Sequence, residues 1–327
     1  MIYRILRPIA RVAFKANFRK IFVSGTENIP SDKPVILAVN HPTAFVEPCL
    51  LACFQPNNLN FLVRGDIWSN PFYNKLMRGV HLIPIYRQKD GYENLTKNYE
   101  TFKYCNLALK DKKTIVVLPE GTTIQGKRLR PIKKGFARIV AGALEEYPDL
   151  DIQIVPVGAN YTYANRKRSE VMITIGEPIP VQNFFQGQHP NRAILQLTNT
   201  IKEKMEAQLV NIPDEKDEPL VESVLEMART QYPDKVVPIR EDSDRRFKME
   251  SSIANTIVNL PEEEKIALEK KIADYKATLK ELGVEDTSLP LKKRSIGFKL
   301  AALLLKIPAL AGFLLNYLPI SLANNFT

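Results

Sequence analysis

The chain has 327 residues, 45% hydrophobic and 25% charged, with 46 lysines and arginines against 36 acids and a net charge of +10. This composition excludes a wholly disordered or collagen-like chain, and the three cysteines make no disulfide framework, which favours a reducing compartment. The length predicts two domains or one with an appendage, and the charge favours a negative partner such as nucleic acid, an anionic membrane or a phosphorylated substrate.

Residues 1–20 contain six basic residues and no acid. Arg4, Arg7, Arg11 and Lys15 are spaced by three and four, so a helix would place them on one side, next to an apolar stripe. The pattern is typical of an amphipathic helix in an anionic membrane interface, and equally of a helix packed on its own domain. Charges interrupt every apolar run, which excludes a signal peptide.

Between residues 21 and 212, short apolar runs alternate with helical patterns. Continuously apolar strands are typical of a sheet covered on both faces. The alternation predicts an α/β fold, a mostly parallel sheet flanked by helices, whose ligands bind in loops beyond the carboxyl ends of the strands. The predicted strands are Pro34–Val39, Leu59–Val63, Val80–Tyr86, Thr114–Leu118, Ile152–Val157 and Val171–Ile175, and the helices are residues 91–110, 135–147 and 191–210, the last capped by Asn191.

Residues 213–287 follow a polar linker at Asn211–Pro219 and carry 19 acids and 12 bases. An apolar seam with helical spacing runs through this region, which predicts a helical appendage that packs against another helix. The seam consists of Leu268, Ile272, Tyr275, Leu279 and Leu282.

Residues 288–327 contain five basic residues, no acid and a long apolar stretch, Phe298–Ile320. The stretch approaches the ~20 residues of a membrane span. Lys299, Lys306 and two prolines interrupt it, so we expect an interfacial or re-entrant membrane segment, with a buried terminal helix as the alternative. The net positive charge of the chain therefore lies at its two ends.

His41 directly follows the predicted strand Pro34–Val39, in the string NHPTAFVEP. Glu47 lies on the same turn, where its carboxylate could accept the imidazole N–H and make the other ring nitrogen a base. A structural hydrogen bond is the alternative for a lone histidine. The sequence contains no Cys or His pair with zinc-ligand spacing, and no metal site is predicted.

Three further strings follow predicted strands. LPEGTT places Glu120, Gly121 and Thr122 in a turn whose backbone N–H groups can approach a ligand, and the basic stretch after it, residues 126–138, favours a phosphate site. A solvated loop and helix face is the alternative for that stretch. HLIPIYR ends in Arg87, which could hold a phosphate with two hydrogen bonds, and IVPVGANY ends in a glycine turn.

In this order, NHPTAFVEP, HLIPIYR, LPEGTT and IVPVGANY resemble the motifs of the glycerophospholipid acyltransferases, the group of lysophosphatidate and glycerol-3-phosphate acyltransferases. The resemblance covers roughly residues 20–210. It implies that His41 is the general base and Glu47 its partner. It also implies that Arg87, Glu120 and Gly121, with Thr122 beside them, bind the phosphate of the acceptor.

The chain departs from the family pattern at two positions. The family usually carries Asp at the position of Val46, whereas the acid here is Glu47; a related subset of these enzymes has the longer spacing. Many members carry Arg at the position of Thr123, and Lys127 or Lys133 could take its place at the phosphate.

The sequence thus predicts an O-acyltransferase of phospholipid synthesis, which moves an acyl group from an acyl-CoA or acyl carrier protein thioester to a hydroxyl of lysophosphatidate or glycerol 3-phosphate. Without a serine nucleophile elbow, direct transfer is expected, and no cofactor is needed. We expect membrane association at the cytoplasmic face. Another lysolipid or an amino-acid lipid as acceptor, or a non-enzymatic membrane-surface protein, are the alternatives. No standard nucleic-acid-binding motif occurs, and a nucleic-acid partner is not expected.

Overall fold

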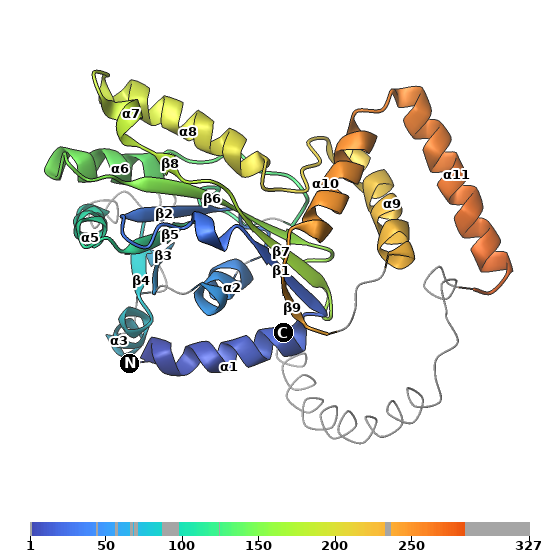
Figure 1. Cartoon of the computed structure of the whole chain (residues 1–327), viewed down its shortest axis with the longest axis horizontal. Helices are drawn as coiled ribbons and strands as arrows, with labels where there is room; N and C mark the ends of the chain where they lie inside the picture. Colours follow the sequence, from blue (N-terminus) through green and yellow to red (C-terminus); the bar gives the residue numbers. More distant parts are fainter. Residues whose placement is uncertain are drawn as a thin grey trace. The chain divides into compact units, whose positions relative to one another are not determined.

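A computed structural model describes residues 2–43, 45–55, 58–65, 68, 71–86, 98–123, 125–232 and 237–284 (Figure 1). The chain forms two compact units, one of residues 1–225 and 234–266 and one of residues 226–233 and 267–327. The sheet belongs to the first unit. The four-part division at residues 20, 212 and 287, which the charge pattern suggests, stays a prediction.

Nine strands of the described chain form one sheet in the order β4-β3-β5-β2-β6-β7-β1-β9, with β8 paired to β6. Neighbouring strands are parallel except for the pairs β6–β7 and β6–β8. The predicted mostly parallel α/β sheet is therefore confirmed. The strands are β1 Lys20–Ser24, β2 Val35–Val39, β3 Leu59–Arg64, β4 Leu82–Ile85, β5 Thr114–Val117, β6 Gln153–Tyr161, β7 Glu170–Ile175, β8 Ile179–Pro180 and β9 Arg240–Asp242.

Helices cover both faces of the sheet (Figure 1). Strand β2 shows why: Val35, Leu37 and Val39 pack under α1 and α2, whereas Ile36 and Ala38 pack under α5, α6 and α8. Successive side chains of a strand point to opposite faces, so a strand that is apolar throughout needs cover on both. The helices are α1 Ile2–Asn17, α2 Val46–Phe54, α3 Pro71–Gly79, α5 Asn98–Lys110, α6 Gly135–Glu146, α7 Gln182–Phe185, α8 Pro190–Glu206, α9 Glu218–Gln231, α10 Arg245–Val258 and α11 Glu262–Glu281.

All six predicted strands are present, as β2 to β7, and β6 continues to Tyr161 because it pairs with β7. Of the predicted helix at residues 91–110, residues 98–110 form α5 and the rest lies outside the described residues. The predicted cap of α8, Asn191, is wrong. His189 is the cap, because Pro190 takes the first helical position, where a missing N–H costs nothing.

Helix α1 packs on its own unit through Tyr3 and Phe14, and Phe18, just after the helix, is buried in the same core. Its basic stripe is partly turned inward, since Arg11 Nε donates to the carbonyl of Cys53 at the end of α2. Its opposite side leaves Ile5, Leu6, Ile9 and Val12 between 46% and 69% exposed. The helix is therefore both packed on the protein and left with an exposed apolar face.

The region 213–287 contains the expected helices, α9 to α11, and also contributes β9, which pairs in parallel with β1. The residues of the predicted seam that lie on α11 are the less exposed ones. Ile272 is buried, and Leu268, Tyr275 and Leu279 are half-buried. Leu282, beyond the end of the helix, is exposed. No helix within the described ranges is long and apolar enough to cross a membrane. Segment 288–327 lies outside those ranges.

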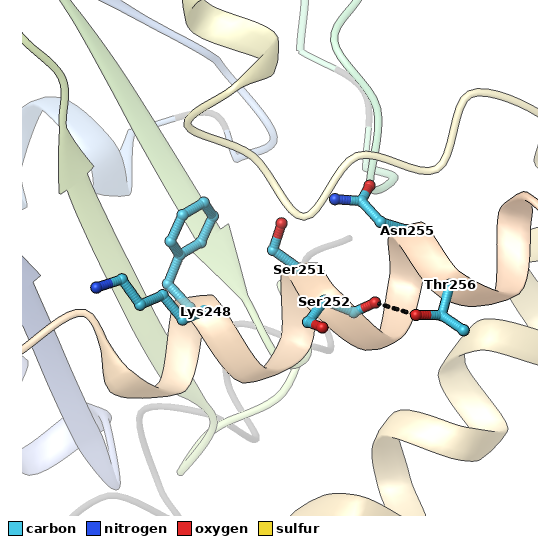
Figure 2. Close-up of a pocket in the computed structure, with 6 residues that line it drawn as sticks. Lys248, Ser251, Ser252, Asn255 and Thr256 are labelled. Carbon is cyan, nitrogen blue, oxygen red and sulfur yellow. Dashed lines mark hydrogen bonds between the residues drawn. The ribbon is translucent and has the colours of Figure 1, made fainter.

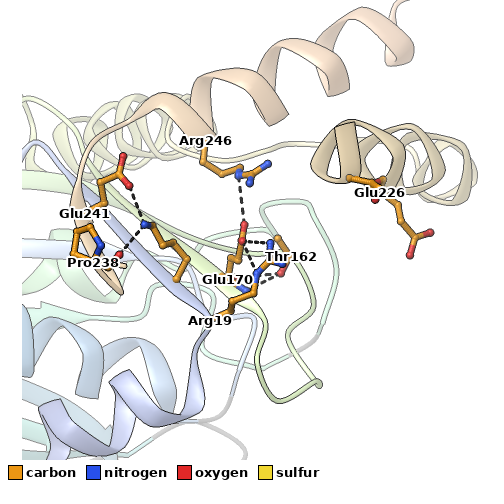
Figure 3. A network of polar contacts seen from close by, with 9 residues as sticks. Arg19, Thr162, Glu170, Glu226, Pro238, Glu241 and Arg246 are labelled. Carbon is orange, nitrogen blue, oxygen red and sulfur yellow. Dashed lines mark hydrogen bonds and ion pairs between the residues drawn. The ribbon is translucent and has the colours of Figure 1, made fainter. Parts of the chain in front are cut away.

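A network of ion pairs, built on the buried side chains of Glu170, Lys20 and Arg246, connects β1, β7, β9 and α10 (Figure 3). Glu170 at the start of β7 lies between Arg19 and Arg246, with 3.3 Å between Glu170 Oε2 and Arg246 Nε. Lys20 at the start of β1 pairs with Glu241 at 3.1 Å and donates to the carbonyl of Pro238 at 2.7 Å. Arg19 and Lys20, the last two basic residues of segment 1–20, thus belong to an internal network.

Candidate active site

The ends of strands β2, β4 and β5 meet at one edge of the sheet, because these strands run parallel. His41 follows β2 at this edge, Tyr86 follows β4, and Glu120 follows β5. The predicted motif residues that lie in the described ranges therefore come from one edge. Arg87 falls outside those ranges, but the preceding Tyr86 is fixed through both backbone groups by Asn98, at 2.8 Å and 2.7 Å.

Asn40 locks the chain as it leaves β2. Its side-chain Nδ2 donates to the carbonyl of Ala159 on β6 at 3.1 Å, and its Oδ1 accepts the Ala159 N–H at 2.7 Å. Asn40 is buried, so both bonds are shielded from water. This two-bond clamp holds the start of the His41 turn against β6.

His41 and Glu47 form the predicted pair, with 3.3 Å between His41 Nδ1 and Glu47 Oε2. The His41 side chain is 12% exposed, whereas that of Glu47 is fully buried. A carboxylate only accepts hydrogen bonds, so the proton of the neutral ring belongs on Nδ1 and the lone pair on Nε2. The pair can therefore act as a base that points its Nε2 away from the carboxylate.

Thr43 holds the other oxygen of the Glu47 carboxylate. Its backbone N–H and its hydroxyl both donate to Oε1, at 2.8 Å and 2.7 Å, while its Oγ1 accepts the N–H of Val46 at 3.3 Å. These reciprocal bonds resemble a capping box at the start of α2. They explain how Glu at position 47, rather than Asp at 46, reaches His41: the longer side chain bridges Thr43 and the imidazole.

Tyr161, at the end of β6, lies beside this pair. Burial raises the pKa of its phenol well above the usual value, and the nearby Glu47 carboxylate raises it further. The phenol therefore stays neutral over the physiological range.

The turn after β5 places Glu120 and Gly121 next to the His41 turn. Glu120 is buried, and burial raises the pKa of its carboxyl, while the Arg130 guanidinium and the backbone N–H groups of Arg130 and His41 lower it. Gly121 has φ of +67°, which favours glycine, and a Cβ there would lie 2.9 Å from Lys133 Nζ. Lys133 therefore covers the turn, and Thr122 beside it is exposed.

The basic stretch after this turn divides into two parts. Lys127 pairs with Glu222 at 2.9 Å and donates to the carbonyl of Tyr161, and Arg128 pairs with Glu218 at 3.1 Å and with Glu215. The expectation that Lys127 could replace a phosphate-binding arginine stays a prediction, and its pairing with Glu222 makes Lys133 the better candidate. Lys133 remains available, and so does Arg130.

Sequence reasoning passed over three residues that the structure places in this site: Asn40, Thr43 and Tyr161. Asn40 and Thr43 lie within two residues of His41 in the motif string, and threonine is a common residue at the start of a helix. Tyr161 is the last residue of the motif string IVPVGANY, but its approach to Glu47 depends on the fold and could not be read from that string.

A separate hollow runs along α10 and is lined by Phe247, Lys248, Ser251, Ser252, Asn255 and Thr256 (Figure 2). It is open and polar, and Thr256 Oγ1 donates to the backbone carbonyl of Ser252 within its own helix. None of the predicted site residues lines it. The chemistry of the chain therefore centres on the His41 edge of the sheet.

Comparison with known proteins agrees with this placement. Residues 20–160 match the profile of the Acyltransferase family. Glycerol-3-phosphate O-acyltransferase 2 of Saccharomyces cerevisiae is 28% identical over 227 residues, which are 67% of this chain and 29% of that protein. Glycerol-3-phosphate O-acyltransferase 1 of the same yeast is 27% identical over 139 residues, 41% of this chain and 18% of that protein.

Among solved structures, 1-acyl-sn-glycerophosphate acyltransferase PlsC of Thermotoga maritima has a TM-score of 0.46 and 20% identity, over 63% of this chain and 78% of that one. The matched part of our chain corresponds to less than a third of the length of either yeast protein. The family match contains His41, Glu47 and Glu120 and the strands that position them. The part of the chain that positions His41, Glu47 and Glu120 is therefore similar to the Acyltransferase family and to the two yeast glycerol-3-phosphate O-acyltransferases.

Proposed function

We propose that the chain is an O-acyltransferase that moves a fatty acyl group from an acyl thioester to a hydroxyl of lysophosphatidate or glycerol 3-phosphate. The observation that carries the proposal is the pair His41–Glu47, with Nδ1 on the buried carboxylate and Thr43 holding its second oxygen. The donor is acyl-CoA or an acyl carrier protein thioester, and the reaction needs no cofactor.

In the proposed reaction, His41 Nε2 takes the proton of the acceptor hydroxyl as that oxygen attacks the thioester carbonyl. The carbonyl electrons move to its oxygen, and they return as the C–S bond breaks and the ester forms. The thiolate leaves with the sulfur electron pair, and the proton on Nε2 is then released to it or to water. Glu47 stabilises the imidazolium that exists between these steps.

The acceptor would be held by its phosphate. Lys133 above Gly121 offers a charge at the turn beside His41, and the flexibility of Gly121 lets backbone N–H groups approach an anion. We assign Glu120, Gly121, Thr122 and Lys133 to this phosphate site, together with Arg87. A fixed phosphate aligns the hydroxyl with Nε2 and so lowers the entropic cost of the reaction.

The direct test is acyl transfer by the purified chain in mixed micelles, with acyl-CoA and carrier-protein donors and with lysophosphatidate and glycerol 3-phosphate as acceptors. His41→Ala should lose roughly 10²- to 10⁴-fold in kcat, as expected for removal of a general base, and keep its thermal midpoint. His189→Ala is the matched control, because His189 lies at the start of α8 and is expected to leave kcat unchanged.

Retained turnover in His41→Ala would refute the base assignment. Transfer only to an unphosphorylated lysolipid or an amino-acid lipid would refute the acceptor class. Liposome binding without transfer from any donor would favour a membrane-surface protein.

We also propose that the chain works at the cytoplasmic face of a membrane, through the exposed apolar side of α1. Ile5, Leu6, Ile9 and Val12 give this side of α1 its apolar character, and the exposed cations Arg4 and Lys15 flank it. Apolar burial and attraction to anionic headgroups act together in such a helix. The acceptor and the product are lipids, so this attachment would bring the His41 edge to its substrate.

Liposome sedimentation with anionic vesicles tests the attachment. Ile9→Asp should lower the bound fraction at least about tenfold in partition constant, because one buried isoleucine contributes roughly 1.5–3 kcal/mol. Leu195→Asp is the control: Leu195 is similarly exposed, on α8, which covers the opposite face of the sheet. Equal losses in the two variants, or no loss in Ile9→Asp, would contradict α1 as the contact.

A further inference from the structure

Arg130 lies on a segment that is pinned beside the Glu120 turn. The Lys133 N–H donates to the carbonyl of Pro119 at 2.8 Å, and the Leu129 N–H donates to Asn211 Oδ1 at 3.3 Å. Leu129 and Ile132 pack into the core on the α5–α6–α8 side of the sheet. The residue between these anchors therefore has a fixed place next to the turn.

The Arg130 guanidinium differs from its basic neighbours in what it contacts. Lys127 and Arg128 are each neutralised by carboxylates of the segment 215–222. Arg130 Nη1 is buried, and within the described parts of the chain no hydrogen bond reaches it. A buried donor without a hydrogen-bond acceptor costs free energy, and a phosphate oxygen bound at Nη1 would recover it.

The surroundings of Arg130 are those of the proposed acceptor. Its guanidinium is close enough to lower the pKa of the Glu120 carboxyl, whose other neighbours include the backbone N–H of His41. Lys133, three residues on, covers Gly121 in the same turn. Arg130 and Lys133 thus offer two cations at the Glu120–Gly121 turn beside the His41–Glu47 pair.

We infer that Arg130 is a binding residue that donates from its guanidinium to the phosphate of the acceptor, and that it thereby sets the preference for phosphorylated acceptors. This inference rests on the proposed function. A planar guanidinium can hold two phosphate oxygens at once, which the ammonium of Lys133 cannot do. Arg130 therefore orients the phosphate, and Lys133 adds charge.

The experiment compares a phosphorylated acceptor with its unphosphorylated counterpart, lysophosphatidate with monoacylglycerol, in mixed micelles. Arg130→Leu should lower kcat/KM for lysophosphatidate about 10- to 100-fold, mostly through KM, since a hydrogen bond to a charged group is lost. The rate with monoacylglycerol should stay within about twofold. Arg130→Lys should recover part of the loss.

Arg138→Leu is the matched control, because Arg138 is an exposed arginine of the same basic stretch, on α6. It should leave both rates unchanged. If Arg130→Leu fails to fold, Arg130→Gln provides the same comparison with a polar side chain of similar length. Equal loss with both acceptors, or no loss with lysophosphatidate, would overturn the inference.

Binding of glycerol 3-phosphate by calorimetry separates this inference from the proposed reaction, because it requires no acyl transfer. Wild type should bind it, and Arg130→Leu should bind at least about tenfold more weakly. Equal affinity of the two proteins would overturn the role of Arg130 even if the wild type is an active acyltransferase. A weakened variant would support it even if every donor tested is inert.

Discussion

Two polar clusters of the first unit differ in how their charged side chains are paired. Where β1, β7 and β9 meet, the cations lie against carboxylates of the fold: Arg19 and Arg246 share Glu170, and Lys20 is paired with Glu241. At the His41 edge, burial raises the pKa of the Glu120 carboxyl, and Arg130 Nη1 has no hydrogen bond within the described chain. The cations of the first cluster are paired with carboxylates of the fold, whereas in the second we propose that an anionic ligand binds Arg130.

The difference separates charges that hold the fold together from charges that could bind a ligand. A matched network fixes the position of strands and helices, and removing one partner leaves a buried charge that the fold must bear. A cluster whose buried polar groups lack partners within the fold lowers stability, and such clusters occur where a substrate supplies the partners. Substitutions in the first cluster should therefore mainly lower stability, and those in the second should mainly change turnover or acceptor binding.

The largest expected effect is on stability, from Glu170→Gln. This change removes the charge of Glu170 from its buried pair with Arg246, and breaking a buried pair costs about 3–5 kcal/mol. Chemical denaturation measures the loss, and kcat at a temperature where the variant is folded should stay near the wild-type value. Arg19→Ala is the control, because the Arg19 side chain is 47% exposed and should contribute less than about 1 kcal/mol. Comparable losses of unfolding free energy in the two variants would contradict the larger contribution that we assign to the buried Glu170–Arg246 pair.

The next effect is on turnover, from Glu47→Gln. The amide can still accept from Thr43, but its NH₂ would face His41 Nδ1 and favour the ring tautomer whose Nε2 carries the proton. The base would then be lost, with a fall in kcat of roughly 10²-fold, about 2.7 kcal/mol of barrier. Steady-state kinetics with a thermal melt separates this from unfolding. Turnover within a few-fold of wild type would remove Glu47 from the mechanism.

The sequence predicted the sheet well because its central strands are apolar without interruption. Strands such as β2 and β5 have to be buried on both faces, and that requirement is visible in the residues alone. Strand β9 was not predicted, since Arg240, Glu241 and Asp242 are all charged. Strand β9 forms because it can pair with the edge of β1, and because the ion pairs Lys20–Glu241 and Arg246–Glu170 fix the segments around it.

The site was predicted where it is local in sequence. His41 and Glu47 lie on one turn, so their pairing follows from spacing, and the turn of Glu120 and Gly121 follows directly after a strand. Pairings between distant segments could not be read in this way. The neutralisation of Lys127 by Glu222 and the approach of Tyr161 to Glu47 depend on how the chain folds back on itself.

A smaller effect is expected from Gly121→Ala. A residue with a side chain at φ of +67° costs about 1–2 kcal/mol, and the new Cβ would push against Lys133 Nζ. Denaturation should show that loss, and KM for the phosphorylated acceptor should rise because Lys133 is displaced. Gly187→Ala is the control, because Gly187 also has φ of +67° but a Cβ added there would meet no atom within 4 Å. It should lose stability and leave KM unchanged, and a KM shift in both would place the effect in backbone strain alone.

The smallest expected effect is a pH dependence of the free energy of unfolding. It tests whether the buried Glu120 carboxyl lacks full compensation for its burial. Burial raises the pKa of Glu120 in the folded chain above its value in the unfolded chain, so the protonated carboxyl favours the folded state. Its stabilising contribution is complete below the unfolded pKa and is lost as pH rises through the folded one. Glu120→Gln does not titrate, so the variant should gain stability relative to wild type as pH rises across that window. Denaturation of both proteins between about pH 4 and 7 gives the difference, and a constant or opposite difference would show that Glu120 is already compensated without a ligand. If the gain appears, adding glycerol 3-phosphate should raise the free energy of unfolding of the wild type, because its phosphate would bind Arg130 and Lys133.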